Sequence, residues 1–202
     1  MASSVQKQRP MLVAATVALA GLFVAALADD ARNILLHMYM HNIFGPPGQR
    51  VVLITKGTGP MNPSMPPEHY FGDTYAFDDL LTENRSESSK HVGRAQGTAM
   101  LASMRRPVYL VDMVILLTGG EFDGDTIVVE GRHDASQEER ELAIVGGTGE
   151  FRTASGYVNC TTAREEKKFT VYELRVNATI PGDDSEPEPP VMRRPLPRVP
   201  PF

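Results

Sequence analysis

Cysteine is nearly absent from this sequence, which has one among 202 residues, Cys160. A secreted domain that is held together by disulfide bonds needs several cysteines, so this chain must rely on a hydrophobic core. One cysteine also excludes a zinc site built from a Cys/His cluster, and we expect no other metal. Because Cys160 lies in a strand-like run, residues 157–162, we expect a buried, inert thiol rather than a reactive one or an intermolecular bridge.

The sequence also lacks an excess of basic residues. The chain has 20 Lys and Arg against 25 Asp and Glu, which gives a formal net charge of −5 at pH 7. A protein that binds nucleic acid needs a basic patch for its phosphate contacts. We therefore expect no nucleic-acid partner.

The sequence lacks the apolar periodicity of helices as well. No segment keeps apolar residues at positions i, i+3, i+4 and i+7 over three or more turns. Strand-like runs recur instead, separated by glycine and proline turns such as Gly45-Pro46-Pro47-Gly48. The runs are residues 33–43, 51–55, 70–77, 92–102, 108–117, 126–130, 142–145, 157–162 and 169–178. Many short strands at this spacing predict an antiparallel sandwich or barrel.

The N-terminal segment predicts a secretory leader. Lys7 and Arg9 precede an uncharged run from Met11 to Ala28, which ends in the small-x-small pattern Ala26-Leu27-Ala28. We predict a cleaved signal peptide over residues 1–28. The alternative is a transmembrane anchor, because a run of about 18 residues is just long enough to span a bilayer. Nearly half of the run is Ala or Gly, which favours cleavage and leaves the mature chain without a membrane segment.

The mature chain divides into a domain and a tail. Residues 29–180 are long enough for one domain with its own core. Residues 181–202 hold eight of the sixteen prolines, with an acidic half followed by a basic half. This composition predicts an extended, disordered tail. The alternative is that Pro195-Leu196-Pro197 binds a proline-reading partner.

Three sequons predict N-linked glycans in a secreted chain. They are Asn84-Arg85-Ser86, Asn159-Cys160-Thr161 and Asn177-Ala178-Thr179. The sequence around Asn84 is polar and typical of a loop, so we expect Asn84 to be the best acceptor.

Two longer motifs carry a family resemblance. VGRAQG at residues 92–97 follows FDDLLT at 77–82, and RELAIVGGTGEFR occupies residues 140–152. With MYMH at 38–41 and ELRV at 173–176, their order and spacing resemble those of plant dirigent proteins. The resemblance covers roughly residues 33–180.

The resemblance implies an all-β fold, an eight-stranded antiparallel β-barrel of the allene-oxide-cyclase type. It implies secretion to the apoplast and a homo-oligomer, a trimer or a dimer. It also implies a role in phenylpropanoid and lignan biosynthesis. A separate laccase or peroxidase makes phenoxy radicals, and the barrel holds them so that they couple with one stereochemistry. Some members instead act on quinone methides. On this reading the chain has no cofactor and assists an external oxidase, and whether it is itself an enzyme is left open.

The same resemblance implies the site residues. Where the family commonly has an aspartate in the first strand, this chain has Asn42; where it has a second pocket aspartate, this chain has His133 followed by Asp134. Arg140 matches the family's arginine. We therefore predict His133, Asp134 and Arg140 as catalytic residues, and Asn42 and Tyr172 as pocket residues.

The departures leave alternatives open. His133 is a loop residue at the barrel rim in one alternative, and Arg140 pairs with a strand-face carboxylate in another. Adjacent strand residues face opposite sides, so His133 and Asp134 cannot both face inward. The loss of pocket acids also favours a second function, a non-catalytic cell-wall or defence module that binds phenolics or glycans. A lipid-epoxide cyclase is suggested by the shared barrel alone.

Overall fold

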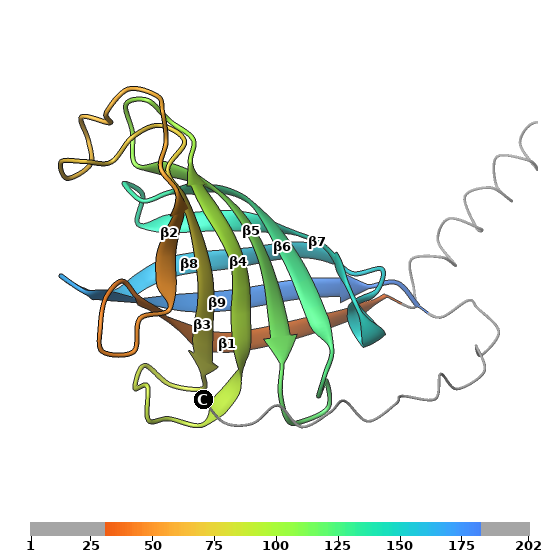
Figure 1. Ribbon diagram of the computed structural model, residues 1–202. Coiled ribbons are helices and arrows are strands. Elements are labelled where there is room, and N and C mark those ends of the chain that lie inside the picture. Colours follow the sequence, from red (N-terminus) through yellow and green to blue (C-terminus); the bar gives the residue numbers. More distant parts are fainter. Residues whose placement is uncertain (1–30, 183–202) are drawn as a thin grey trace, which may run out of the picture. The chain divides into compact units, whose positions relative to one another are not determined.

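The computed structural model describes residues 31–182, which fold into an antiparallel β-barrel (Figure 1). The predicted signal peptide and nearly all of the predicted tail lie outside the described residues. The strands are β1 Arg32–Ile43, β2 Val51–Thr55, β3 Thr74–Thr82, β4 His91–Leu101, β5 Val108–Leu117, β6 Thr126–Asp134, β7 Glu139–Gly147, β8 Ser155–Glu166 and β9 Phe169–Ile180. The helical content of this part is one 3₁₀ turn, η1 Gly149–Phe151. No helix within residues 31–182 has the length and apolar character needed to cross a membrane.

Eight strands close the barrel in the order β1-β9-β8-β7-β6-β5-β4-β3. Closure occurs where Tyr39, Met40 and His41 of β1 pair with Thr82, Leu81 and Leu80 of β3. This confirms the predicted eight-stranded antiparallel barrel. The ninth strand, β2, pairs with the other half of β3, where Val51 lies opposite Phe77. Strands β1 and β2 therefore lie along β3 as one barrel strand that residues 44–50 interrupt.

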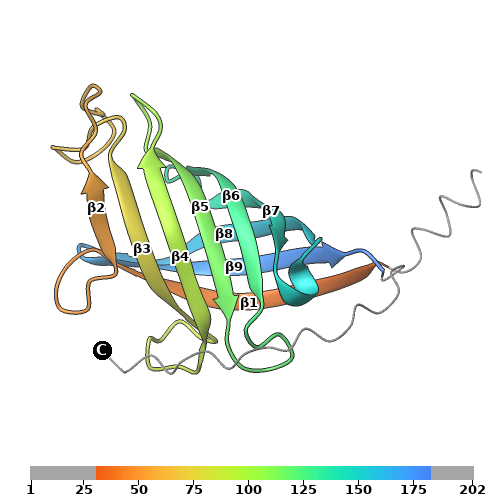
Figure 2. The same ribbon diagram turned by 45° about the vertical axis from the view of Figure 1, so that its right-hand side comes forward.

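One end of the barrel is capped by loops. Figure 2 shows the loop after β2 and the loop between β4 and β5 together at the same end. Hydrogen bonds join them, because the Asn62 side-chain amide donates to the carbonyls of Ser103 (2.7 Å) and Arg106 (2.8 Å). Asn62 is itself buried. These bonds satisfy its polar group and fix the position of the loop over the barrel end.

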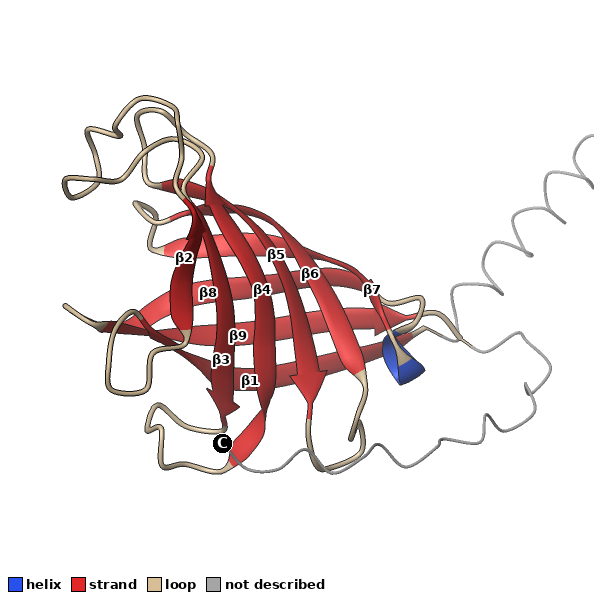
Figure 3. Ribbon diagram, in the orientation of Figure 1, coloured by secondary structure: helices blue, strands red, loops and turns tan. Residues whose placement is uncertain are grey.

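The opposite end is packed with apolar side chains. The turn η1 lies at this end, coloured blue in Figure 3. It carries Phe151, which is fully buried and packs edge-on against Phe122 with the ring centroids 5.1 Å apart. Burial of one such side chain contributes about 1.5–3 kcal/mol to the stability of the fold. Apolar side chains therefore fill the barrel interior at the η1 end, and the cavity lies toward the loop cap.

The strands lie where the sequence predicts them, with two kinds of difference. Strands β3, β6 and β8 run past the predicted ends at residues 77, 130 and 162, to Thr82, Asp134 and Glu166, and β7 extends beyond the predicted 142–145 at both ends. Strand β3 begins at Thr74 rather than at residue 70. The cause is Asp73, whose carboxylate accepts the backbone N–H groups of Gly57 and Tyr70, both at 2.8 Å, and holds the preceding residues in a turn.

Strand β7 contains a bulge at its double glycine, Gly146-Gly147. Val128 pairs with Gly146, but Val129 pairs with Ile144, so Val145 is an extra residue on β7. Gly146 has φ +136°, in the region that favours glycine. The Val145 side chain faces outward and is exposed.

Candidate functional site

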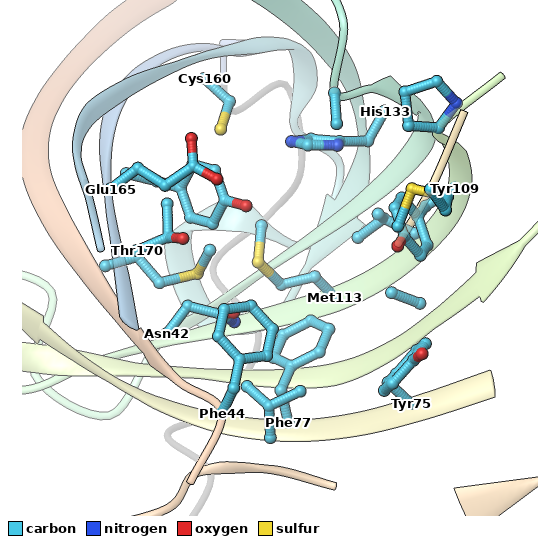
Figure 4. Close-up of a pocket in the computed structure, with 18 of the residues that line it drawn as sticks. Asn42, Phe44, Tyr75, Phe77, Tyr109, Met113, His133, Cys160, Glu165 and Thr170 are labelled. Atoms are coloured by element: carbon cyan, nitrogen blue, oxygen red, sulfur yellow. The ribbon is translucent and has the colours of Figure 1, made fainter. Parts of the chain in front are cut away.

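A cavity of about 840 Å³ occupies the loop-capped half of the barrel (Figure 4). Inward-facing side chains of the strands form its wall, since alternate strand residues point to the same side. Its apolar lining comes from Met40, Phe44, Val51, Tyr75, Phe77, Ala99, Tyr109, Val111, Met113, Leu142, Tyr172 and Leu174. This is the size and lining of a site for a small aromatic ligand.

The mouth of the cavity is formed by three connecting segments. Met65, Pro66 and His69 come from the loop after β2, and Pro107 comes from the loop between β4 and β5. The charged lining residues Glu165, Glu166 and Lys167 belong to the exposed β8–β9 hairpin. Charge is therefore concentrated at the mouth, and the enclosed wall is apolar with a few polar groups.

His133 lines the cavity from β6, so it is a strand residue and not a rim-loop residue. Its ring packs edge-on against Tyr172, with the centroids 5.7 Å apart. Burial, assisted by the positive charge of Arg140, lowers the pKa of His133 to about 4. At neutral pH the imidazole is therefore uncharged and acts as a hydrogen-bond donor or acceptor.

Asp134, the next residue, is buried on the other side of β6 and does not line the cavity. Its carboxylate pairs with Arg106 at 2.7 Å and with Arg132 at 2.9 Å. The Ser136 hydroxyl, which donates to it at 2.6 Å, is the main cause of the lowered pKa of Asp134. The structure thus separates the two candidate proton donors, and the catalytic role of each stays a prediction.

Arg140 lies inside the barrel wall, close to the cavity but not among its lining residues. Its guanidinium donates to the Cys160 carbonyl (3.1 Å) and to the Thr162 hydroxyl (2.8 Å). It also lies 5.7 Å from the centroid of the Tyr172 ring. These partners are neutral, so the expected pairing with a strand-face carboxylate is not what holds Arg140.

The cysteine and tyrosine side chains in the enclosed wall keep their protons at neutral pH. Burial raises the pKa of Cys160 to about 11, which confirms that its thiol is buried and indicates that it is inert. Burial also raises the pKa of Tyr109 and of Tyr172. With neutral His133, these groups give the cavity hydrogen-bonding capacity without charge.

Asn42 lines the cavity from β1, as the resemblance implies, and has a partner that the sequence did not assign. Its Nδ2 donates to Oδ2 of Asp79 on β3 at 2.5 Å. Asp79 is fully buried, and burial raises its pKa to about 7 in spite of the bond from Asn42. The predicted strand ended at residue 77 and so missed this residue; because β3 runs on to Thr82, one of the neighbours Asp78 and Asp79 must face inward.

The predicted glycan acceptors differ in exposure. Asn84 is exposed in the turn after β3. Asn159 and Asn177 are half-buried in strands β8 and β9, and the Asn177 amide donates to the Tyr157 hydroxyl at 3.0 Å. For metals, the described residues contain no group of three or more His, Cys, Asp or Glu side chains placed to hold an ion.

Comparison with known proteins gives a consistent result. A family model described as "Dirigent-like protein" matches residues 34–179. Dirigent protein 1 of Arabidopsis thaliana is 39% identical over 122 residues, 60% of this chain and 65% of that protein. Pterocarpan synthase 1 of Glycine max is 39% identical over 123 residues, 60% of this chain and 64% of that protein. The chain thus spans slightly less than two thirds of the length of these relatives.

A solved structure shows the same architecture. The pterocarpan synthase dirigent protein GePTS1 superimposes with a TM-score of 0.67 and 29% sequence identity. The match covers 75% of this chain and 89% of that one. The barrel fold is therefore shared with a protein of that kind.

Proposed function

The chain belongs to the dirigent family, and on that premise we propose that its cavity holds phenolic radicals or a quinone methide in one orientation. The product then forms with one stereochemistry. The observation that carries the proposal is the 840 Å³ cavity, with its aromatic lining and uncharged enclosed wall. Phenols, phenoxy radicals and quinone methides are neutral, so a wall without charge suits all three.

The size of the cavity favours two small phenols or one polycyclic product. Pockets of roughly 300–1,000 Å³ hold drug-sized ligands, and this cavity lies in the upper part of that range. Phe44, Phe77 and Tyr75 supply ring faces and edges against which aromatic ligands pack. Figure 4 shows Asn42, Phe44 and Phe77 on one side of the cavity and Tyr109 and His133 on another.

Radical coupling requires only that the cavity hold the two radicals in a fixed relative orientation. An external laccase or peroxidase removes one electron and one proton from each phenol. Two phenoxy radicals then combine their unpaired electrons in one carbon–carbon bond, and no electron passes to the protein. Because the coupling has little barrier, the contribution of the cavity is to present one face of each radical to the other. The proposed secretion to the apoplast would place the protein beside such an oxidase.

Conversion of a quinone methide also requires hydrogen bonds to its carbonyl oxygen. A nucleophile adds to the exocyclic carbon, an electron pair moves into the ring, and the former carbonyl oxygen takes up a proton. Tyr109, Tyr172 and His133 can polarise that oxygen by donating hydrogen bonds. Pterocarpan synthases among the relatives favour including this reaction in the proposal.

The test adds laccase and coniferyl alcohol to the full chain and resolves the products by chiral chromatography. A second arm uses a phenol with a benzylic leaving group, which gives a quinone methide when the group departs. We expect an enantiomeric excess in at least one arm, and racemic products in both would reject the proposal.

Two matched variants show whether the cavity is responsible. Val51→Phe fills the cavity, whereas Val52→Phe makes the same change at the exposed neighbouring residue of the same strand, β2. Val51→Phe is expected to abolish the enantiomeric excess and Val52→Phe to retain it.

A second candidate function is a non-catalytic module that binds phenolics or glycans. It is favoured by Asn42 and His133, which line the cavity where the family commonly has aspartates. Calorimetric binding of coniferyl alcohol or of a cell-wall glycan, together with racemic products in both arms, would assign this function.

A further inference from the structure

The Asn42 side chain has two different ends, and the structure fixes which one is free. The amide group donates through Nδ2 and accepts through Oδ1. Nδ2 is used by Asp79 at 2.5 Å, which leaves Oδ1 as the end available to the cavity that Asn42 lines. In this orientation, the Asn42 amide presents Oδ1, a hydrogen-bond acceptor, to the cavity from the β1 side.

The Asp79 carboxylate has one hydrogen-bond partner among the described residues, the Asn42 side chain. Asp79 is fully buried on β3, two residues after the cavity residue Phe77, and its register partner on β4 is Ala95. Its Oδ2 accepts from Asn42, and its Oδ1 has no hydrogen-bond partner within the described part of the chain.

The charged groups around Asp79 have ion-pair partners of their own, although Nη1 of Arg50 is buried without a hydrogen-bond partner in the described part of the chain. Arg50, next to β2, pairs with Glu87, and Arg94 of β4 pairs with Asp78, the neighbour of Asp79. The two arginines favour the ionised form of Asp79 and Asp78 opposes it, but neither effect exceeds that of burial. Asp79 is therefore a buried carboxyl group whose one hydrogen-bond partner is a residue of the cavity wall.

We propose that Asp79 is a positioning residue: its protonation state sets which end of the Asn42 amide faces the cavity, and so which phenolic species binds there. The proposal rests on the proposed function, because it takes phenolic species as the ligands. An ionised carboxylate only accepts hydrogen bonds, so Asn42 must turn Nδ2 toward it and offer Oδ1 to the cavity. Such an acceptor suits the O–H of a phenol.

When Asp79 is protonated, the Asn42 amide presents its N–H to the cavity instead of its oxygen. A protonated Asp79 donates its O–H to Oδ1 of Asn42, the amide turns over, and its N–H faces the cavity. Such a donor suits an oxygen without a proton, as in a phenoxy radical or a quinone methide. The proton stays on Asp79 throughout, and no bond to the ligand forms or breaks. Since the pKa of Asp79 is about 7, both states are accessible near neutral pH.

The experiment uses two probes of nearly the same shape, 4-methylphenol and 4-methylanisole. The phenol can donate a hydrogen bond, and the ether can only accept one. Calorimetry on the full chain gives the affinity ratio of phenol to ether between pH 5 and 9. His133 does not titrate in this range, because its pKa is about 4. We expect the ratio to rise by roughly fivefold as the pH passes through 7, the effect of about one net hydrogen bond.

Two variants locate the titrating group. Asp79→Asn cannot ionise, so its ratio should stay constant with pH. Asp78→Asn makes the same change on the exposed neighbour and should keep a pH dependence, with its midpoint moved to lower pH because Asp78 no longer opposes the ionisation of Asp79. A ratio that is flat in the wild type overturns the inference, and this measurement does not require Asp79→Asn to fold. A pH dependence that survives in Asp79→Asn overturns it as well.

The outcomes separate this inference from the proposed function. Stereoselective products with a flat ratio reject the role of Asp79 and retain the function. Racemic products with a ratio that shifts through pH 7 retain the role of Asp79 in ligand binding and reject stereochemical control. Failure of both probes to bind rejects the inference together with the phenol-binding cavity.

Discussion

His133 and Asp134 are adjacent in sequence, yet β6 places them in opposite environments. His133 faces the apolar cavity and is neutral at pH 7, because burial disfavours its charged form. Asp134 faces Arg106 and Arg132 and is ionised. The arrangement argues for a structural role of Asp134 in joining β6 to the loop before β5 that carries Arg106.

Asp134→Asn is predicted to lower the free energy of unfolding by about 1–2 kcal/mol at pH 7, because buried charge-assisted hydrogen bonds are lost. The pKa of Asp134 is lowered in the folded state, so its stabilisation is present above the ordinary carboxyl pKa of about 4. It is lost as the pH falls through the lowered pKa. Urea unfolding between pH 7 and pH 2 should therefore show the wild type and the variant converging.

Asp112→Asn on the exposed side of β5 is the control and should leave stability unchanged. Loss of stereoselectivity in Asp134→Asn at unchanged stability would instead place Asp134 in the chemistry.

The residues of the site were predictable to different degrees. Asn42, His133 and Tyr172 line the cavity, as the family resemblance and strand alternation suggested. The pairing of Asn42 with Asp79 was not predictable from local sequence, because the two residues are 37 positions apart. They meet only through the closure of β1 onto β3, which is a property of the whole barrel.

At the scale of the strands, apolar alternation located every element but not every end. The last residues of β6, Gly131 to Asp134, are polar or lack a side chain, so they show no apolar alternation that would indicate a strand. Their strand conformation comes from pairing with β5, where His133 lies opposite Tyr109. Neighbouring strands can thus extend an element beyond its own propensity.

Gly146→Ala tests the bulge in β7. A β-carbon at this position would have the Arg152 carbonyl oxygen as its nearest neighbour at 3.5 Å, so space is available. The cost arises from φ +136°, which residues with a side chain rarely adopt, and we expect a loss of about 1–3 kcal/mol in the free energy of unfolding. Urea denaturation measures it.

The control for Gly146→Ala is Val145→Ala, a change at the exposed neighbouring residue. It should alter the free energy of unfolding by less than about 0.5 kcal/mol. Equal losses in the two variants would mean that the backbone conformation of Gly146 is not what stabilises the bulge.

At the scale of the whole molecule, the exposure of the three sequons predicts one occupied glycan site. Asn84 lies in an exposed turn, whereas Asn159 and Asn177 lie half-buried in paired strands. Glycan attachment is expected at surface loops, so Asn84→Gln should remove one glycan from protein secreted by a plant cell. Mass spectrometry measures this, and Asn177→Gln is the control that should leave the mass of the attached glycan unchanged. A glycan retained in Asn84→Gln but lost in Asn177→Gln would contradict the prediction.

An apolar strip on the outer face of the barrel predicts self-association. Val114 and Val128 are paired across β5 and β6, and Val145, 55% exposed, is the bulge residue of β7 beside Val128. Tyr157 of β8, 38% exposed, lies opposite Ala143 of β7. Apolar side chains on one outer face favour a protein contact, and a second copy of the chain fits the predicted dimer or trimer.

Val145→Glu is expected to shift the protein to monomers in sedimentation velocity, because assembly would bury the new carboxylate without a partner. Leu35→Glu makes a similar change on β1 at a side chain that is 74% exposed and should leave assembly intact. The cavity lies inside the barrel and the Val145 side chain faces outward, so the monomeric Val145→Glu protein should still bind 4-methylphenol with the affinity of the wild type. A monomeric wild type, or dissociation caused by Leu35→Glu alone, would show that the β5–β8 face is not the contact.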